Sequence, residues 1–356
     1  MTRPLAPFPW HGGKSRVADL VWARFGAVPN YVEPFAGSLA VLLGRPHAPK
    51  VETVNDLDAL LVNFWRAVKW APAQVAEYSD WPVSEVDMHA RHAELVERKE
   101  ALRARLLADP RAYDTELAGW WVWGVCQWIG GGWGHRYQWK GRVPSLGNAR
   151  GHGITTLEAR PLEKKRPHLS RPGRGILKTT TLPSIGEPGR GVLAKKPATG
   201  SIGKGVHAQR RTVLGTMAAL AARLRRVRIV CGDWKRVLGR STLGIDVRHG
   251  MSPCGVFFDP PYDVDQRKAG LYAEDEPGVA ADVREWAIAN GDNPDLRIAL
   301  CGFEGEHDMP TSWSCVAWKS QGGHENAARE RIWFSPHCLN GVMSEPLFAR
   351  RKAATS

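Results

Sequence analysis

The residue types best suited to chemistry lie together in Asp259-Pro260-Pro261-Tyr262, directly after the apolar run 255–258. The run predicts a buried strand, and the two prolines force the backbone out of regular structure after it. Ligands of open α/β sheets bind at the carboxyl ends of strands, so Asp259 and Tyr262 should face a crevice. The Asp259 carboxylate and the Pro260 carbonyl can accept hydrogen bonds from an amino group, and Tyr262 offers a ring for stacking. The four residues favour a flat, amino-bearing ring such as adenine, although an ordinary Asp-Pro turn explains them equally well.

A second group of candidates lies near the amino terminus, in the stretch from Trp10 to Ser15. Its Gly-Lys-Ser is similar to the end of a phosphate-binding P-loop, but that motif requires glycine where this chain has Phe8, after a hydrophobic strand. What remains is a glycine pair that opens a helix, with the cation of Lys14 and an aromatic ring beside it. Such a corner can hold a carboxylate.

Two strand-helix units follow. The stretch 30–38 predicts a strand and a loop bent by Pro and Gly, before a helix that starts at 39–43. The stretch 51–54 predicts a second strand, followed by a helix over 57–70. This order is typical of a doubly wound sheet with a cofactor over its first turn, although the glycine spacing differs from the dinucleotide motif. Asp56 follows the second strand, where such folds bind ribose hydroxyls, but a helix cap is an equal alternative.

The hydrophobic periodicity of the rest of the chain predicts further helices and strands. The helices are expected at 16–25, 84–108, 115–128, 212–224 and 279–290, and the strands at 227–231, 255–258, 296–301, 315–318 and 331–334. Little helix separates the last two strands, which indicates an antiparallel hairpin at the sheet edge. We therefore predict an α/β fold with a mixed sheet and a long insertion.

The charge of the chain is concentrated in its middle. Residues 136–228 hold 21 lysines and arginines against three acids, a net +18, which leaves −5 for the remainder of a chain whose total is +13. Residues 143–207 also contain irregular repeats rich in Gly and Pro. This composition predicts a polyanionic partner, although a basic segment can serve solubility alone.

Aromatic rings are interleaved with cations at the start of this basic segment. Such a mixture suits stacking on bases and contacts to phosphates, although we expect at least half of the tryptophans between 120 and 139 to be core residues. The candidates for nucleic-acid contact are Arg136, Tyr137, Lys140 and Arg142.

Six scattered cysteines form no C-x-x-C pair, so neither a metal site nor a disulfide framework is expected. No apolar run approaches the roughly 18 residues of a membrane span, and the amino terminus lacks a signal-peptide core. We expect a soluble intracellular protein.

In its order of motifs, the chain resembles the Dam-type DNA adenine-N6 methyltransferases. The motifs are Trp-x-Gly-Gly-Lys, Glu-Pro-Phe-x-Gly, an aspartate after the second strand, an insertion, a Gly-Asp-aromatic turn and Asp-Pro-Pro-Tyr, within residues 8–70 and 226–335. The resemblance implies a Rossmann-like catalytic domain formed by 1–70 and 226–340, a helical and basic DNA target-recognition region at 71–225, and a flexible tail at 341–356. The Gly/Pro-rich middle differs from the compact region of the best-known members and resembles phage-borne relatives, so the target sequence stays open.

The resemblance also implies partners and residue roles. The cofactor is S-adenosylmethionine and the partner is double-stranded DNA, acted on by a monomer or weak dimer in the cytoplasm of a bacterium or a phage-infected host. The implied cofactor-binding residues are Trp10, Lys14, Glu33, Phe35, Gly37, Asp56, Asp233 and Asp259. The implied catalytic residues, which would hold a base flipped out of the duplex, are Asp259, Pro260 and Tyr262. Two alternatives stay open: cytosine N4 as the methyl acceptor, and a non-catalytic DNA-binding protein that keeps the fold. Whether a restriction enzyme accompanies the protein is also open.

Overall fold

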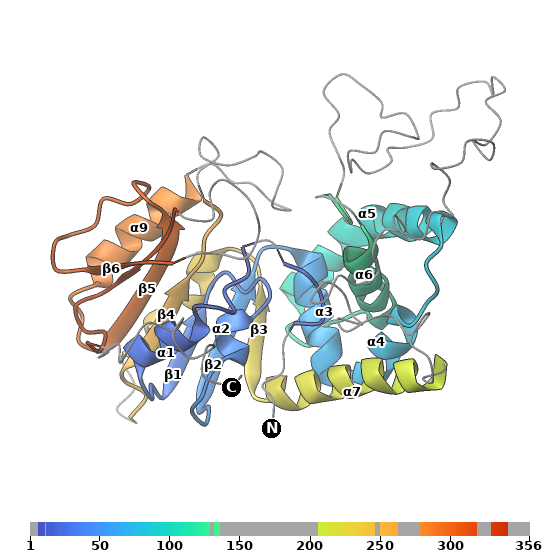
Figure 1. Cartoon of the computed structure of the whole chain (residues 1–356), viewed down its shortest axis with the longest axis horizontal. Helices are drawn as coiled ribbons and strands as arrows, with labels where there is room; N and C mark the ends of the chain where they lie inside the picture. Colours follow the sequence, from blue (N-terminus) through green and yellow to red (C-terminus); the bar gives the residue numbers. More distant parts are fainter. Residues whose placement is uncertain are drawn as a thin grey trace, which may run out of the picture.

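A computed structural model describes residues 6–10, 12–128, 132–135, 206–245, 250–262, 278–318 and 329–340, without the side chains of 206–211. Within these residues a seven-stranded sheet lies beside a group of helices (Figure 1). The candidate DNA contacts Arg136, Tyr137, Lys140 and Arg142, nearly all of the repeats and the tail lie outside the described residues.

The strand order of the sheet is β3-β2-β1-β4-β5-β7-β6. Its parallel strands are β1 (Asn30–Glu33), β2 (Val51–Asp56), β3 (Val227–Cys231), β4 (Cys254–Phe258) and β5 (Leu296–Phe303). The edge hairpin consists of β6 (Ser314–Ala317) and β7 (Glu330–Phe334), with β7 antiparallel to both β5 and β6. The predicted Rossmann-like fold with a mixed sheet and an antiparallel edge hairpin is confirmed.

The strand order reverses at β1, because β2 and β3 are added on one side of it and β4 and β5 on the other. In an open α/β sheet, the crevice at such a reversal is where ligands bind. Both strands that flank it, β1 and β4, are buried along their whole length. Helices α1 (Ala18–Phe25) and α2 (Ala40–Leu43) lie on one face of the sheet in Figure 1, and α9 (Val279–Asn290) joins β4 to β5. The end of this central strand pair is therefore the place to look for a site.

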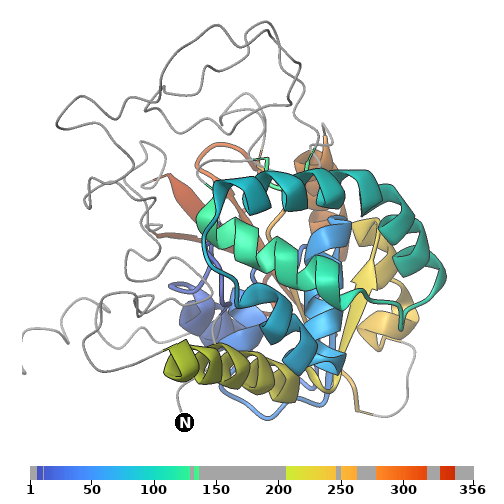
Figure 2. The same ribbon diagram turned by 90° about the vertical axis from the view of Figure 1, so that its right-hand side faces the viewer.

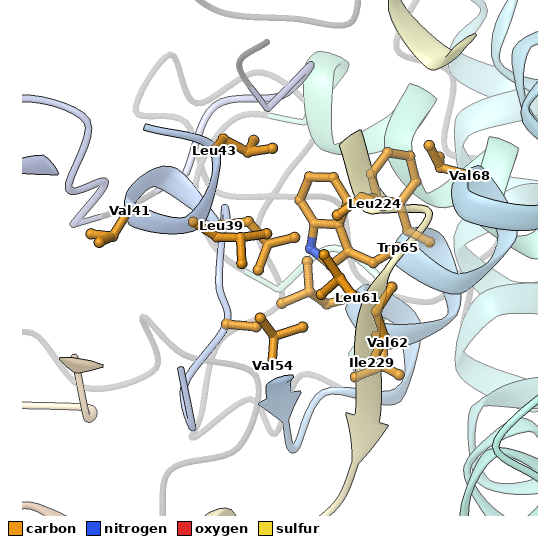
Figure 3. Packing of buried hydrophobic residues seen from close by; sticks show 14 of the residues in the cluster. Leu39, Val41, Leu43, Val54, Leu61, Val62, Trp65, Val68, Leu224 and Ile229 are labelled. Atoms are coloured by element: carbon orange, nitrogen blue, oxygen red, sulfur yellow. The ribbon is translucent and has the colours of Figure 1, made fainter. Parts of the chain in front are cut away.

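A continuous hydrophobic cluster connects the sheet to the neighbouring helices. Figure 3 shows Leu39 and Val54 from the sheet side meeting Trp65 of α3 (Ala59–Trp70) and Leu224 of α7 (Val206–Leu224). Burial of such large apolar side chains stabilises a fold by about 1.5–3 kcal/mol each. The sheet and α3 consequently share one core.

The remaining helices pack around α6 (Thr115–Gln127), which contacts α3, α4 (Pro72–Ser79) and α5 (Glu85–Ala108), while α7 packs against α4 (Figure 2). Close packing relies on glycine: a Cβ at Gly124 would lie 1.7 Å from the ring of Trp133. Trp121, Trp123 and Trp133 are buried, in line with the expectation that at least half of the tryptophans between 120 and 139 are core residues. Among the described residues, no helix is long and apolar enough to cross a bilayer.

Candidate active site

Acidic side chains follow three adjacent parallel strands. Glu33 is the last residue of β1, Asp56 is the last residue of β2, and Asp259 comes directly after β4. Because these strands run in the same direction in the order β2-β1-β4, their carboxyl ends meet at one edge of the sheet. This edge is where the sequence placed its candidate site.

The centre of the site is an ion pair between Lys14 and Asp259. Lys14 Nζ lies 2.8 Å from Asp259 Oδ1, and the two side chains are 4% and 22% exposed. Lys14 Nζ also donates a hydrogen bond to the carbonyl of Gly12 at 2.8 Å, and it lies 5.2 Å from the ring centroid of Tyr262 and 5.5 Å from that of Trp318. The glycine-lysine corner that precedes α1 therefore delivers its cation to the carboxyl end of β4.

Tyr262 is held at both its ring and its hydroxyl. The residue is 4% exposed, and its ring packs edge-on against Phe303 with centroids 4.6 Å apart. Its hydroxyl lies 2.8 Å from Glu330 Oε2 and 3.3 Å from Asp259 Oδ1. The sequence predicted a ring that faces a crevice for stacking, whereas the structure has this ring packed inside the site.

Glu33 is buried beneath this centre. Its carboxylate accepts a hydrogen bond from the hydroxyl of Tyr31 at 3.0 Å. Burial raises the pKa of Glu33 well above its ordinary value, the Tyr31 hydrogen bond opposes that shift, and the negative charge of Asp259 adds to it. Burial thus favours the neutral form of this carboxyl group, and a cation close to it would favour the ionised form again.

The loop after β1 bends sharply at Gly37, whose φ is +46°. A Cβ at this position would lie 2.8 Å from Trp10 Nε1, so only glycine lets the indole approach. The Gly37 carbonyl accepts a hydrogen bond from Trp65 Nε1 at 3.0 Å, and its N–H donates to Asp56 Oδ2 at 3.0 Å. Trp10, the loop and the end of β2 are thereby fixed against one another.

Asp56 also accepts a hydrogen bond from the backbone N–H of Asp58 at 3.0 Å. Burial raises the pKa of Asp56 to about 6, despite the opposing effect of these backbone donors. The neighbouring Asn55 Nδ2 donates to the carbonyls of Pro34 at 3.0 Å and Gly232 at 2.9 Å. The loops after β1 and β3 are therefore tied together across β2.

An aromatic pair lies near the carboxyl end of β3. The ring of Phe35 stacks on Trp234 with centroids 6.1 Å apart and planes 30° apart. Asp233 is exposed, and its Oδ1 accepts a hydrogen bond from the N–H of Lys235 at 2.8 Å, which caps the short 3₁₀ helix η1 (Trp234–Val237). In this structure Asp233 acts as a helix cap, and its cofactor role stays a prediction.

The structure adds residues that sequence reasoning did not select. Glu330 is the first residue of β7, Phe303 is the last residue of β5, and Trp318 directly follows β6. They reach the site because β7 pairs antiparallel with β5, which places Glu330 opposite Phe303. The sequence does show an acid, Glu330, directly before the strand predicted at 331–334. Its partner Tyr262 lies 68 positions away in the chain, so their contact could not be predicted.

Comparison with protein families gives one match. Residues 10–98 match the model of the D12 class N6 adenine-specific DNA methyltransferases. No curated protein matches the chain. The match to residues 10–98 confirms the predicted resemblance to Dam-type adenine methyltransferases over this part of the chain. The matched residues contain Trp10, Lys14, loop 33–37 and Asp56.

Proposed function

We propose that this chain, which matches the D12 class N6 adenine-specific DNA methyltransferases over residues 10–98, methylates the N6 amino group of adenine in DNA at the carboxyl edge of β1 and β4. The observation that carries the proposal is the Asp259 carboxylate at this edge, held by Lys14. Methyltransferases of this family generally use S-adenosylmethionine, so the same edge must also accept that cofactor.

The residues at this edge fit S-adenosylmethionine. The tight approach of Trp10 to Gly37 shapes the loop after β1, and Phe35 and Trp234 form an aromatic pair beside it. We assign the cofactor's adenine to this aromatic pair, its ribose hydroxyls to the Asp56 carboxylate, and its positive charges to the side of Glu33. When bound, the cofactor supplies a methyl group on a cationic sulfur.

Asp259 and Pro260 prepare the amino group of the target base. The lone pair of this nitrogen is delocalised into the ring, so the group is a poor nucleophile. Hydrogen bonds from its two N–H groups to the Asp259 carboxylate and the Pro260 carbonyl localise the lone pair for attack. The bond between methyl carbon and sulfur would break as the N–C bond forms, so the nitrogen would carry a positive charge until one of its two protons passes to the Asp259 carboxylate.

Lys14 orients Asp259 for this role. Lys14 Nζ and the Tyr262 hydroxyl oxygen both lie beside Asp259 Oδ1, at 2.8 Å and 3.3 Å. We therefore assign Oδ2 of the same carboxylate to the target amino group. The positive charge of the buried Lys14 ammonium balances the negative charge of the Asp259 carboxylate before the base arrives.

The target base must leave the duplex to reach this edge, at a cost of a few kcal/mol. We propose that residues 71–225 form the DNA target-recognition region that the sequence predicts. Its basic part would bind phosphates, with affinity that falls steeply as salt increases.

The test is Asp259→Ala with labelled cofactor and unmethylated DNA. Methyl transfer should fall by about 10²–10³-fold or more, because one preorganised polar group is removed from the reacting atoms. Retention of DNA on filters should stay near that of the natural protein. Retained activity or lost DNA binding would contradict the assigned role.

The methylated product should then be digested to nucleosides. N6-methyladenosine is the expected product, whereas N4-methylcytidine would support the cytosine alternative. Absence of any methyl transfer by the natural protein, together with DNA binding, would support the non-catalytic alternative.

A further inference from the structure

Glu330 is a third carboxylate of the site that the proposed reaction does not yet use. It is the first residue of β7 and is 4% exposed. Its Oε2 lies 2.8 Å from the hydroxyl of Tyr262, whose ring belongs to the Asp-Pro-Pro-Tyr stretch. Burying a carboxylate costs desolvation free energy, so a buried carboxylate that has been retained suggests a role in the site.

The Tyr262 hydroxyl has a single proton and two carboxylates within reach. Glu330 Oε2 lies 2.8 Å from the hydroxyl oxygen, and Asp259 Oδ1 lies 3.3 Å from it. An ionised Glu330 is the closer acceptor and attracts the proton. Asp259 then keeps its lone pairs for Lys14 and for a target amino group.

We propose that Glu330 is a positioning residue, which draws the Tyr262 hydroxyl proton away from Asp259 and so keeps Asp259 an acceptor for the target amino group. The inference rests on the proposed function of the same site. Glu330 acts through Tyr262, and the placement of the Tyr262 ring depends on the same hydrogen bond.

The charges around Glu330 make the arrangement sensitive to pH. Burial raises the pKa of Glu330, the charge of Lys14 and the Tyr262 hydrogen bond oppose that shift, and Asp259 and Glu306 add to it. On β5, the buried thiol of Cys301 also has a raised pKa, so it adds no charge at neutral pH.

Protonation would reverse the direction of this hydrogen-bond chain. A protonated Glu330 donates its own proton to the Tyr262 oxygen, and Tyr262 in turn donates to Asp259. Asp259 Oδ1 then accepts from Tyr262 as well as from Lys14, which withdraws charge from the carboxylate and weakens Oδ2 as an acceptor for the target amino group. The number of protons in the chain rises only by the one that Glu330 gained. Methyl transfer should therefore decline as pH falls through the raised pKa of Glu330.

The experiment compares single-turnover methylation rates of Glu330→Gln, Tyr262→Phe and the double variant across pH, with saturating cofactor and DNA. Glu330→Gln should lower the plateau rate about tenfold, since the amide accepts more weakly and can donate. The acidic decline should also move to lower pH in this variant. In the Tyr262→Phe background, Glu330→Gln should change the rate less than about twofold, because coupled residues are not additive.

Glu304→Gln is the matched control, because this neighbouring carboxylate is 62% exposed and pairs with Arg331 outside the site. It should retain the natural rate and pH profile. An equal effect of Glu330→Gln with and without the Tyr262 hydroxyl, or an unmoved acidic decline, would overturn the inference.

Two measurements other than activity exclude a folding defect. Equilibrium affinity for S-adenosylhomocysteine should be unchanged in Glu330→Gln. A raised folded-state pKa means that ionised Glu330 costs stability once pH rises through that pKa, so the variant should unfold at the same or a higher temperature at alkaline pH. A lower unfolding temperature would show a structural role instead.

The two proposals fail separately. If the natural protein does not methylate adenine, the proposed function is wrong. If the natural protein methylates adenine and Glu330→Gln matches it at every pH, only the role of Glu330 is wrong.

Discussion

Buried charges lie at both ends of the central strands, and the two groups differ in the sign that predominates. At the amino ends, Glu52 of β2 lies between two guanidinium groups, with Arg45 Nη1 3.2 Å and Arg223 Nη1 2.7 Å from its carboxylate oxygens. Further N–H groups of the two arginines donate to the carbonyls of Val28 and Leu42. We call Arg45, Glu52 and Arg223 the amino-edge cluster.

The carboxyl-edge cluster consists of Lys14, Glu33, Asp259 and Glu330. Here three carboxyl groups lie with one ammonium, which pairs with Asp259 and acts on Glu330, and burial raises the pKa of both Glu33 and Glu330. The amino-edge cluster satisfies its anion with its own cations, as expected for an ion pair that maintains the fold. The carboxyl-edge cluster has an excess of carboxyl groups, which suits an arriving cation such as a sulfonium.

The largest loss of stability should come from breaking the amino-edge cluster. Glu52→Ala leaves the buried guanidinium of Arg45 and the partly buried one of Arg223 without their anion, and should lower the free energy of unfolding by about 3–5 kcal/mol. Urea denaturation measures this change, and methylation per folded molecule should be unchanged. The exposed Asp282, which pairs with Lys235 on the surface, provides the control, because Asp282→Ala should leave the urea midpoint in place. A small loss for Glu52→Ala would contradict the structural role of the cluster.

At the carboxyl edge, backbone shape should matter more than charge for stability. Gly37→Ala forces a Cβ against the Trp10 indole in a left-handed conformation, and should cost about 2 kcal/mol. Cofactor affinity should fall as Trp10 is displaced, which fluorescence titration can follow. At Gly239, where the structure shows open space, Gly239→Ala should change neither property. Equal behaviour of the two variants would show that the approach of Trp10 is unimportant.

The carboxyl edge should also respond to pH through Asp56, whose pKa burial raises to about 6. Ribose hydroxyls donate best to the ionised form, so cofactor affinity should weaken about tenfold for each pH unit below that pKa. Calorimetry can measure this change of affinity with pH. The Asp56→Asn variant should bind the cofactor weakly at every pH, with no change of affinity near pH 6. The stability contribution has the opposite sign, since it is present at low pH and lost as pH rises through about 6. Affinity that does not change with pH in the natural protein would exclude Asp56 from the ribose site.

The smallest effect on stability is expected from a conservative change in the carboxyl-edge cluster. Asp259→Asn should lower the free energy of unfolding by less than about 1 kcal/mol, because the amide oxygen still accepts from Lys14. The same variant should lose most methyl transfer. A stability loss as large as that of Glu52→Ala would make Asp259 a structural residue, and would remove the contrast between the two clusters.

Local sequence patterns predicted the parts of the site that lie at strand ends. An apolar run followed by an acid places Glu33, Asp56 and Asp259 correctly, since a parallel sheet aligns its carboxyl ends. The fold class and the edge hairpin followed from the same periodicity. The contacts between these residues could not be predicted, because the approach of Lys14 to Asp259 joins positions 245 residues apart.

Side-chain orientation was harder to predict than position. The Tyr262 ring was expected to be open to a base, yet Phe303 and Glu330 pack against it. Both partners lie in strands that come later in the chain, and their register depends on tertiary pairing. By contrast, Trp121 and Trp123 of α6 are core residues, as the sequence predicted. The glycines at 119 and 124 let Tyr78 and the ring of Trp133 pack closely against this helix.

The two hydrogen bonds from the Asn55 amide have a consequence for how the ligand edge comes apart. A single side chain links the loops after β1 and β3, so opening either loop while β2 stays in the sheet breaks one of these hydrogen bonds. The hydrogen bonds from Asn55 therefore form as soon as these strands have assembled. The backbone amide hydrogens of these two loops should exchange with solvent only when the whole sheet unfolds.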